Sequence, residues 1–542
     1  MFGGECLDQL VGFDLEFSAT FSLKELLTQR QRSRQNPSSR RGPDSPLLLL
    51  TSQAASQSPS RVKSSTLVVV DETGEVTMTA RSRGFFVMVW ILPTAFIPLV
   101  QPIQLCADQA SWIRSINEGA KYHQEARYRE AEKAFLNALE EAEDSPGQDL
   151  RLSVNLNNLA LLYSDEGRYR EAEPLYLRAL ELRERILGPD HPELALTLNN
   201  LGILYRSQAL YAKADPLFQR ALSILEKQYG PKHTEIAMVL NNLAASRYEQ
   251  GDYSQAEELL RRALSIRDKL QGSATPEVAR TLNNLGEIDR VRGRYAEAGE
   301  RCHRALDILE KTLGPEHPDT AAALNNLASL SVNQGRYKEA ERFYRRALAA
   351  LEKNFGMEHP TVATGLNNLA ALRCELRDYS EAERLDQHAL AIREKTLGPE
   401  HPDVASSLNN LATVYCYEKR YAEAEALSRR ALAIWQKVLG PEHREVAAGL
   451  TNLAQTCYQQ GRYQEAASLL QRSLAIREKV LGPDHPSIAE TLKQYASALR
   501  KMKQKSEAAK MEARARDTHA HSSRASQTQH TVDVLALRQM GK

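Results

Sequence analysis

The sequence repeats itself every 42 residues over most of its length, and this period constrains the fold more than any other feature. The motif Leu-Asn-Asn-Leu begins at Leu156 and returns at this step as far as Leu408. A tyrosine followed three residues later by an alanine keeps the same step from Tyr169 to Tyr463. Three markers share the period, since a Gly-Pro-acid-His-Pro segment also recurs, most clearly at 188–192, 314–318, 398–402 and 482–486. One period in three markers predicts an array of similar structural units.

Each unit contains two helical patterns. In the unit at 192–229, one helix is expected over about 192–208 and a second over about 211–228, because small and apolar residues recur there at i, i+3, i+4 and i+7. Gly230 and Pro231 should end the second helix, since glycine adopts the left-handed cap and proline cannot continue a helix.

Small residues explain how such helices pack. One position of every first helix is alanine or glycine, from Ala160 to Ala454, and one position of every second helix is alanine, from Ala172 to Ala466. Each helix pair alone leaves an apolar face uncovered, so it must stack on its neighbours. With degenerate end units included, about ten units are expected over 108–518. The predicted fold is all-α, a right-handed α-solenoid superhelix of helix-turn-helix units.

The segment HPELALTLNNLGILYRSQALYAKADPLFQRALSILEKQYGP resembles a tetratricopeptide repeat, in particular the 42-residue variety of kinesin light chains and their bacterial look-alikes. The likeness extends over about 400 residues. It implies a solenoid of tetratricopeptide units that binds proteins or peptides. Kinesin light chains also share an N-terminal heptad coiled coil that joins the motor chain. This sequence lacks such heptads, so a motor role is not expected.

The asparagine pairs flank the side of the first helix opposite its apolar stripe. First helices line the concave surface in solenoids of this kind. The first asparagine of each pair is therefore predicted to contact a peptide backbone, with which an amide can pair whatever the sequence, and the resemblance implies the same use. The alternative is that the pairs fix the stacking of helices, a role expected above all for the second asparagine. The predicted ladder consists of Asn157, Asn199, Asn241, Asn283, Asn325, Asn367 and Asn409.

Selectivity is expected from groove positions that differ between units. Arg280, Glu287 and Arg290 lie in one unit and are the sharpest candidates for reading a charged ligand side chain. The alternative is that they pair with one another in solvent, which contributes only about 0–1 kcal/mol. Further candidates are Arg206, Glu249, Glu375, Tyr417 and Tyr458.

Three charged residues stand where other units have a packing tyrosine, at the position of Tyr163 and Tyr205. They are Arg247, Asp289 and Arg373. A charge at a packing position needs a partner or costs stability. The middle of the array is therefore expected to be either functionally specialised or more loosely packed.

Seven histidines recur in the loops, one for each unit, and they are more consistent with helix capping or loop packing than with a metal site, whose ligands must converge. They are His191, His233, His317, His359, His401, His443 and His485. The sequence has no Gly-rich phosphate loop, nucleophile elbow or HExxH motif. The six cysteines include no CxxC pair and are expected to be free thiols. No enzymatic activity, cofactor, metal or small-molecule substrate is predicted.

Charge argues against nucleic acid as a partner, since 70 basic and 69 acidic residues leave a formal net charge of +1. The leading interpretation is a non-catalytic scaffold that binds proteins or peptides in the concave groove. The alternative is a regulatory or adaptor module, kinesin light chain-like or in signalling, that controls a partner protein. A hydrolase in the degenerate end units is a third, weaker hypothesis.

The first hundred residues differ from the array. Residues 1–77 include Ser-, Gln- and Arg-rich stretches without helical periodicity and are predicted to be disordered, as is the tail at 519–542. Residues 78–107 have the layout of a signal peptide, with Arg81 and Arg83 before an apolar run. Our hypothesis is that translation starts at Met78, so that 1–77 is untranslated or dispensable, and that the protein is exported or associated with the envelope. The alternatives are an uncleaved hydrophobic anchor over 84–105, which would be the chain's membrane contact, and a cytoplasmic protein.

Overall fold

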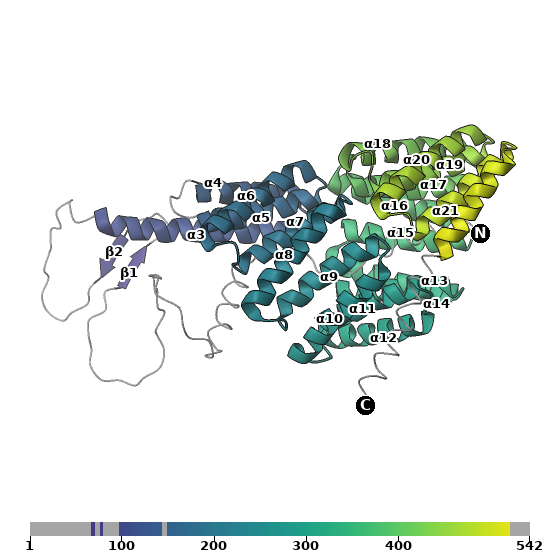
Figure 1. The fold of residues 1–542 in the computed structure, drawn as a ribbon. Coiled ribbons are helices and arrows are strands. Elements are labelled where there is room, and N and C mark those ends of the chain that lie inside the picture. The colour runs from purple at the N-terminus through teal and green to yellow at the C-terminus, as the bar shows by residue number, and fades with distance from the viewer. Residues whose placement is uncertain (1–66, 71–75, 80–96, 144–148, 521–542) are drawn as a thin grey trace, which may run out of the picture. The chain divides into compact units, whose positions relative to one another are not determined.

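The computed structural model describes residues 67–70, 76–79, 97–143 and 149–520 (Figure 1). The chain divides into two compact units, one within 23–111 and one that contains 112–520. In the first, strands β1 (Leu67–Val70) and β2 (Val76–Thr79) pair in antiparallel register, with Leu67 opposite Thr79. Part of the segment predicted to be disordered is thus a hairpin, because its β-branched residues favour extended backbone.

The other expectations for the N-terminal segment fall mostly on residues that the structure does not describe, which include 1–66 and 80–96. The signal peptide, the start at Met78 and the export of the protein therefore stay predictions. None of the helices described in the structure has the length and apolar character needed to span a bilayer. Helix α3 begins at Ile97, within the segment assigned to the signal peptide or anchor.

The second compact unit is built from helices that follow one another in pairs. Together with α3 (Ile97–Gln124) and a last helix over 505–520, the described residues give ten such pairs. The helices between them are α4 (Tyr128–Glu143), α5 (Asp149–Asp165), α6 (Tyr169–Leu187), α7 (Glu193–Ser207), α8 (Tyr211–Tyr229), α9 (Thr234–Glu249), α10 (Tyr253–Gln271), α11 (Pro276–Val291), α12 (Tyr295–Thr312), α13 (Pro318–Asn333), α14 (Tyr337–Phe355), α15 (Pro360–Glu375), α16 (Tyr379–Leu397), α17 (Pro402–Tyr417), α18 (Tyr421–Val438), α19 (Arg444–Gln459), α20 (Tyr463–Leu481) and α21 (Pro486–Lys501).

This arrangement confirms the predicted solenoid of helix-turn-helix units. The helices expected over 192–208 and 211–228 are α7 and α8, each within a residue or two of its predicted ends. Gly230 follows α8 with φ 76°, the left-handed conformation expected of a glycine cap. The last helix extends to residue 520, two residues into the predicted tail, and the rest of the tail lies outside the described residues.

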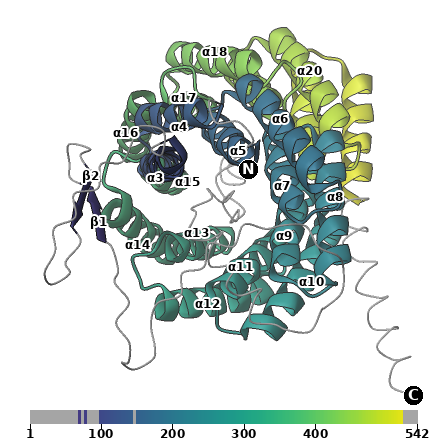
Figure 2. The ribbon, with the colours of Figure 1, turned by 90° about the vertical axis from the view of Figure 1, so that its left-hand side faces the viewer.

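The two helices of a pair take different places in the array. Figure 2 shows the odd-numbered first helices, such as α7 and α9, on the inner side and their partners α8 and α10 on the outer side. The alanines of the second helices are fully buried from Ala172 to Ala466, where a larger side chain would separate the paired helices. Apolar clusters extend across neighbouring units, one of them from Val278 to Val414, as stacking requires.

The loop histidines cap helices, as predicted. In each of the seven, Nδ1 accepts a hydrogen bond from the amide two residues further on, from His191 with Glu193 (3.3 Å) to His485 with Ser487 (3.2 Å). This satisfies one of the amides that a helix N-terminus leaves unpaired. An imidazole can accept at Nδ1 only when that nitrogen is unprotonated.

Some of these histidines also join units far apart in sequence. The Nε2 of His401 lies 3.1 Å from the carbonyl oxygen of Asp165, and that of His443 lies 3.2 Å from the carbonyl oxygen of Ser207. Both contacts span 236 residues. Loops at the start of α17 and α19 therefore rest on turns that end α5 and α7, six units earlier in the chain.

Two glycines provide a matched test of the packing. A Cβ added to Gly202 would lie 2.7 Å from Cε1 of Phe218, which is too close. A Cβ added to Gly299 would lie 3.7 Å from Cδ2 of Leu330, which is an ordinary contact. Both replacements by alanine gain helix propensity of about 1 kcal/mol. Gly202→Ala also overpacks the core, so it should be about 1–3 kcal/mol less stable than Gly299→Ala. Urea unfolding followed by circular dichroism measures this difference, and equal stabilities would contradict the close packing.

Candidate functional site

The predicted asparagine ladder exists, but it runs through the interior of the array. Six of its seven members are buried, and Asn325 is half-buried. The second asparagine of one unit donates to the first of the preceding unit, as in Asn242 Nδ2 to Asn199 Oδ1 at 2.9 Å. The same link joins Asn200 to Asn157 and Asn452 to Asn409.

At these three steps both asparagines stabilise stacking, whereas the sequence analysis assigned groove contact to the first and stacking to the second. The helical wheel placed these amides on the side opposite the apolar stripe, but the next first helix covers that side. Asn367 shows the same use with other partners, since its Nδ2 donates to Asp386 Oδ1 at 2.6 Å. Burial raises the pKa of Asp386 to about 8. Contact of the ladder with a ligand stays a prediction.

Glu287 and Arg290 form the pair that the alternative interpretation anticipated, although inside the protein and not in solvent. Arg290 donates from Nε and Nη2 to the two carboxylate oxygens of Glu287, each at 2.8 Å. Glu287 also accepts from Tyr248 Oη at 2.7 Å, and Arg290 donates to Asn333 Oδ1 at 2.8 Å. The network links α9, α11 and α13, so these two charges hold three successive units together.

Arg280 and Arg206 likewise pair within the protein. Arg280 lies 2.7 Å from Asp319 on the next first helix. Arg206 is only 3% exposed and lies 3.7 Å from Glu249, which also lies 3.6 Å from Arg444. Because Arg444 begins α19, Glu249 joins two distant parts of the array at the same place as the histidine contacts.

The charges at tyrosine positions all have partners, as burial requires. Arg247 lies 3.0 Å from Asp215, and Arg373 forms an ion pair with Glu341. Asp289 forms ion pairs with Arg294 and Arg301, which lower its pKa, but burial outweighs them and raises the pKa above its usual value. These charged residues therefore have a structural role, because each forms an ion pair within the middle of the array.

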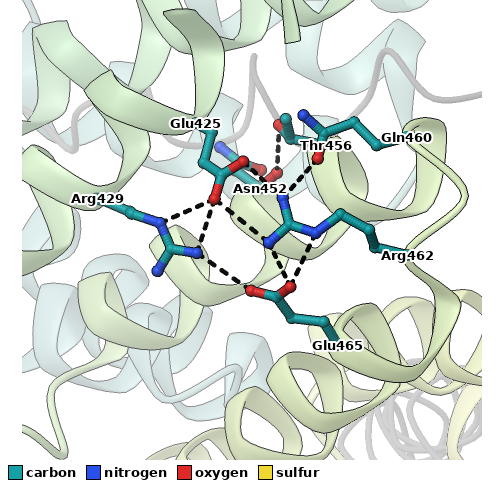
Figure 3. Close-up of polar contacts among 7 residues, drawn as sticks. All are labelled: Glu425, Arg429, Asn452, Thr456, Gln460, Arg462 and Glu465. Atoms are coloured by element: carbon teal, nitrogen blue, oxygen red, sulfur yellow. Dashed lines mark hydrogen bonds and ion pairs between the residues drawn. The ribbon is translucent and has the colours of Figure 1, made fainter. Parts of the chain in front are cut away.

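Ion pairs also recur at the turns between the two helices of a unit. Figure 3 shows one such cluster, in which Arg462 donates to Glu425 at 2.6 Å and to Glu465, while Arg429 contacts both carboxylates. Arg168 and Arg420 form equivalent clusters at their own turns. These side chains are partly exposed, so each pair contributes little to stability. We interpret the clusters as links between neighbouring units.

A polar pocket of about 140 Å³ lies among α17, α18, α19, α20 and α21. Amide and hydroxyl side chains dominate its lining, among them Thr413, Gln455 and Gln494. Tyr417, one of the variable groove positions, is exposed at the pocket, whereas Ser428 is buried. The described lining contains no acidic residue. Most of its residues come from three successive first helices, with Ser428 and Arg477 added from the second helices α18 and α20. An extended segment lying across the three first helices would meet residues from each of them.

The sequence analysis did not identify most of this pocket. Ser428 occupies the position of Tyr176, Phe218 and Tyr344 in other units, and its small side chain leaves space that those rings would fill. Aligning the repeats column by column would have revealed the exchange. Only the structure shows that the space beside Ser428 is an open pocket, because a neighbouring side chain could equally have filled it.

Four of the six cysteines, Cys302, Cys374, Cys416 and Cys457, form no disulfide, in agreement with the prediction. Burial raises the pKa of Cys457 to about 11, so its thiolate is disfavoured at neutral pH. Among the residues that the structure places, no three His, Cys, Asp or Glu side chains converge as metal ligands would.

Comparison with protein families matches the description "Tetratricopeptide repeat" to most of the array. The matched ranges are 151–227, 208–269, 277–353, 361–421, 403–479 and 450–519, and a second family with the same description matches 241–309. No curated protein matches the chain.

Several solved structures are similar. A Podosopora anserina putative kinesin light chain with nearly identical TPR-like repeats is 31% identical, and the match covers 38% of this chain and 96% of that one with a TM-score of 0.33. BtubC (BKLC) from P. vanneervenii is 26% identical over 45% of this chain and 92% of its own, also with a TM-score of 0.33. A Rap protein complexed with Competence and Sporulation Factor is 14% identical over 69% and 99%, with a TM-score of 0.48.

Proposed function

Because this chain belongs to the tetratricopeptide repeat family, as the resemblance of its repeats predicted, we propose that it is a non-catalytic scaffold that holds an extended peptide or partner segment on its inner face. Repeat proteins of this kind serve protein interaction through surfaces shared by several units. The coarser statement, that the array is a protein-interaction scaffold, rests on the family alone. The finer statement concerns where the partner lies and what it offers.

The observation that carries the proposal is the polar pocket lined by residues of α17 to α21. Its amides and hydroxyls can donate to and accept from a peptide backbone without regard to sequence. Several asparagines of the ladder, by contrast, are hydrogen-bonded between units, as in the bond of Asn242 to Asn199. Binding is therefore assigned to inner-face side chains that the stacking leaves available.

Filling the pocket should abolish capture of peptides. The full chain would be immobilised and a phage library of random 12-residue peptides selected against it. Gln455→Trp places an indole among the lining residues, so selected peptides should bind it about tenfold or more weakly than the wild type, the loss of about 1.4 kcal/mol or more. Fluorescence anisotropy with synthetic copies of these peptides measures the affinities.

The matched control is Gln471→Trp, the same exchange at an exposed position of α20 on the outer side. It should leave binding unchanged. Equal binding by the two variants would show that the inner face is not the site. Circular dichroism of both variants confirms that helicity is retained.

A further inference from the structure

Four second helices carry an arginine at the same buried position, and one of these arginines differs from the others. The four are Arg183, Arg267, Arg393 and Arg477. Each of the first three donates to a hydroxyl and to a backbone carbonyl of the next first helix. Arg183, for example, donates to Thr197 Oγ1 at 2.6 Å and to the carbonyl oxygen of Glu193 at 3.1 Å. Arg267 repeats this pattern with Thr281 and Glu277.

Arg393 shows the most complete set of partners. Its Nη1 donates to Asn367 Oδ1 and to Ser407 Oγ, and its Nη2 donates to Thr364 Oγ1 at 2.9 Å. Two of these three partners come from α15, the first helix of its own unit. A guanidinium has five donors, and burial without acceptors is costly.

Arg477 is 7% exposed and lines the polar pocket. Its Nε has no hydrogen-bond partner among the described residues, as is also true of Arg267 and Arg393, but Arg477 differs from these two because its terminal nitrogens form no hydrogen bond or ion pair with the described residues. Its own unit lacks two of the partners that Arg393 has, and the hydroxyl of Thr491, at the position of Thr281, donates to the carbonyl oxygen of Ser487. Ala448 stands at the position of Thr364, and Thr451 stands at that of Asn367. Thr451 directs its hydroxyl to the carbonyl oxygen of Ala447 at 3.0 Å, away from Arg477.

The same exchanges create the space beside the arginine. Ala448 is smaller than Thr364, Thr451 is smaller than Asn367, and Ser428 is smaller than Tyr344 at the equivalent positions, and all three of these smaller residues line the pocket. Ser428 is 1% exposed and its hydroxyl also lacks a partner among the described residues. Two buried polar groups without partners therefore face one cavity that has no acidic lining.

Building on the proposed function, we propose that Arg477 is the anchor of this pocket and binds a carboxylate of the captured peptide. A guanidinium binds a carboxylate through two parallel charge-assisted hydrogen bonds, which are stronger than neutral ones. The carboxylate is either an acidic side chain or the C-terminus of the peptide. The amides of Gln455 and Gln494 hold the adjoining backbone.

A double-mutant cycle between protein and peptide tests the assignment. Peptides from the phage selection, which have no free C-terminus on the phage, would be synthesised with each Glu or Asp changed to its amide, and with free or amidated C-termini. Removing the bound carboxylate should weaken binding to the wild type about tenfold or more. Arg477→Met should bind both forms of the peptide equally, because the group that distinguishes them is gone.

Two further variants keep the result interpretable. Ala448→Thr restores the hydroxyl that Thr364 gives Arg393, so it should raise the melting temperature, fill part of the pocket and weaken the acidic peptides. Arg472→Met removes an exposed arginine from the same helix and should change neither property.

The outcomes separate the two proposals. If the protein prefers peptides with acidic residues, Arg477 binds a side-chain carboxylate, and if it prefers peptides with a free C-terminus, Arg477 binds the terminal carboxylate. Either preference supports the anchor when the Arg477→Met variant loses it. Peptides that bind without any carboxylate preference, or whose preference survives in Arg477→Met, would overturn the anchor while leaving the scaffold intact. Failure to select any peptide, both from this library and from one displayed with free C-termini, would overturn the scaffold itself.

Discussion

Replacing Glu287 by alanine should lower the free energy of unfolding by about 3–5 kcal/mol. Glu287 is 1% exposed. Its carboxylate accepts two hydrogen bonds from the guanidinium of Arg290 and one from the hydroxyl of Tyr248. Its removal leaves the Arg290 guanidinium, which is 4% exposed, without its counter-charge inside the protein. Urea unfolding followed by circular dichroism measures the loss.

Two controls identify the buried charge as the cause. Glu287→Leu combined with Arg290→Met removes both charges, so it should recover most of the loss, as apolar replacements of buried ion pairs often do. Glu358→Ala breaks the exposed pair with Lys395, where the side chains are 70% and 63% exposed, and should change stability by less than about 1 kcal/mol. A Glu287→Ala protein within that margin of the wild type would contradict the network.

Acidification from pH 6.5 to 4 should destabilise the array through His443, by about 3 kcal/mol. Burial lowers the pKa of this imidazole from 6.5 to about 4, and Arg444 acts in the same direction, while the Ser207 carbonyl and Glu249 oppose it. In the unfolded chain the histidine takes up a proton near pH 6.5, and in the folded chain only near 4. The unfolded state therefore binds more protons in this window, and stability falls as the pH falls.

The neutral ring has two roles that protonation disturbs. Its Nδ1 accepts from the amide of Glu445, and its Nε2 lies against the carbonyl oxygen of Ser207. His443→Asn keeps a capping oxygen but cannot titrate, so its melting temperature should fall less steeply between pH 6.5 and 4 than that of the wild type. Identical pH profiles for the two proteins would show that His443 titrates normally.

Most of the fold could be predicted from the sequence because the signals that define it lie between residues close together along the chain. Markers every 42 residues, glycine caps such as Gly230 and the buried alanines each constrain local structure, and together they predicted the helix pairs and their boundaries. The capping histidines followed for the same reason, since a cap involves residues two positions apart.

The candidate site was predicted less well. The prediction that Asn199 lies on an open face considered a single helix. In the stacked array, Asn242 of the next unit covers that face. Arg280, Glu287 and Arg290 were correctly identified as unusual, but their partners come from neighbouring helices, as with Asp319. Arg477 gave no signal by itself, because three equivalent arginines are structural.

The sequence by itself determined the unit, its repetition and its caps, all of which depend on residues close together in the chain. Only the tertiary structure decided which polar groups are satisfied. The contact of His401 with Asp165 joins residues 236 apart, and Arg477 lacks the hydrogen bonds that the equivalent Arg393 forms with neighbouring helices. Hydrogen bonds act over about 3 Å, so the partner of a buried side chain is set by packing and not by spacing along the chain.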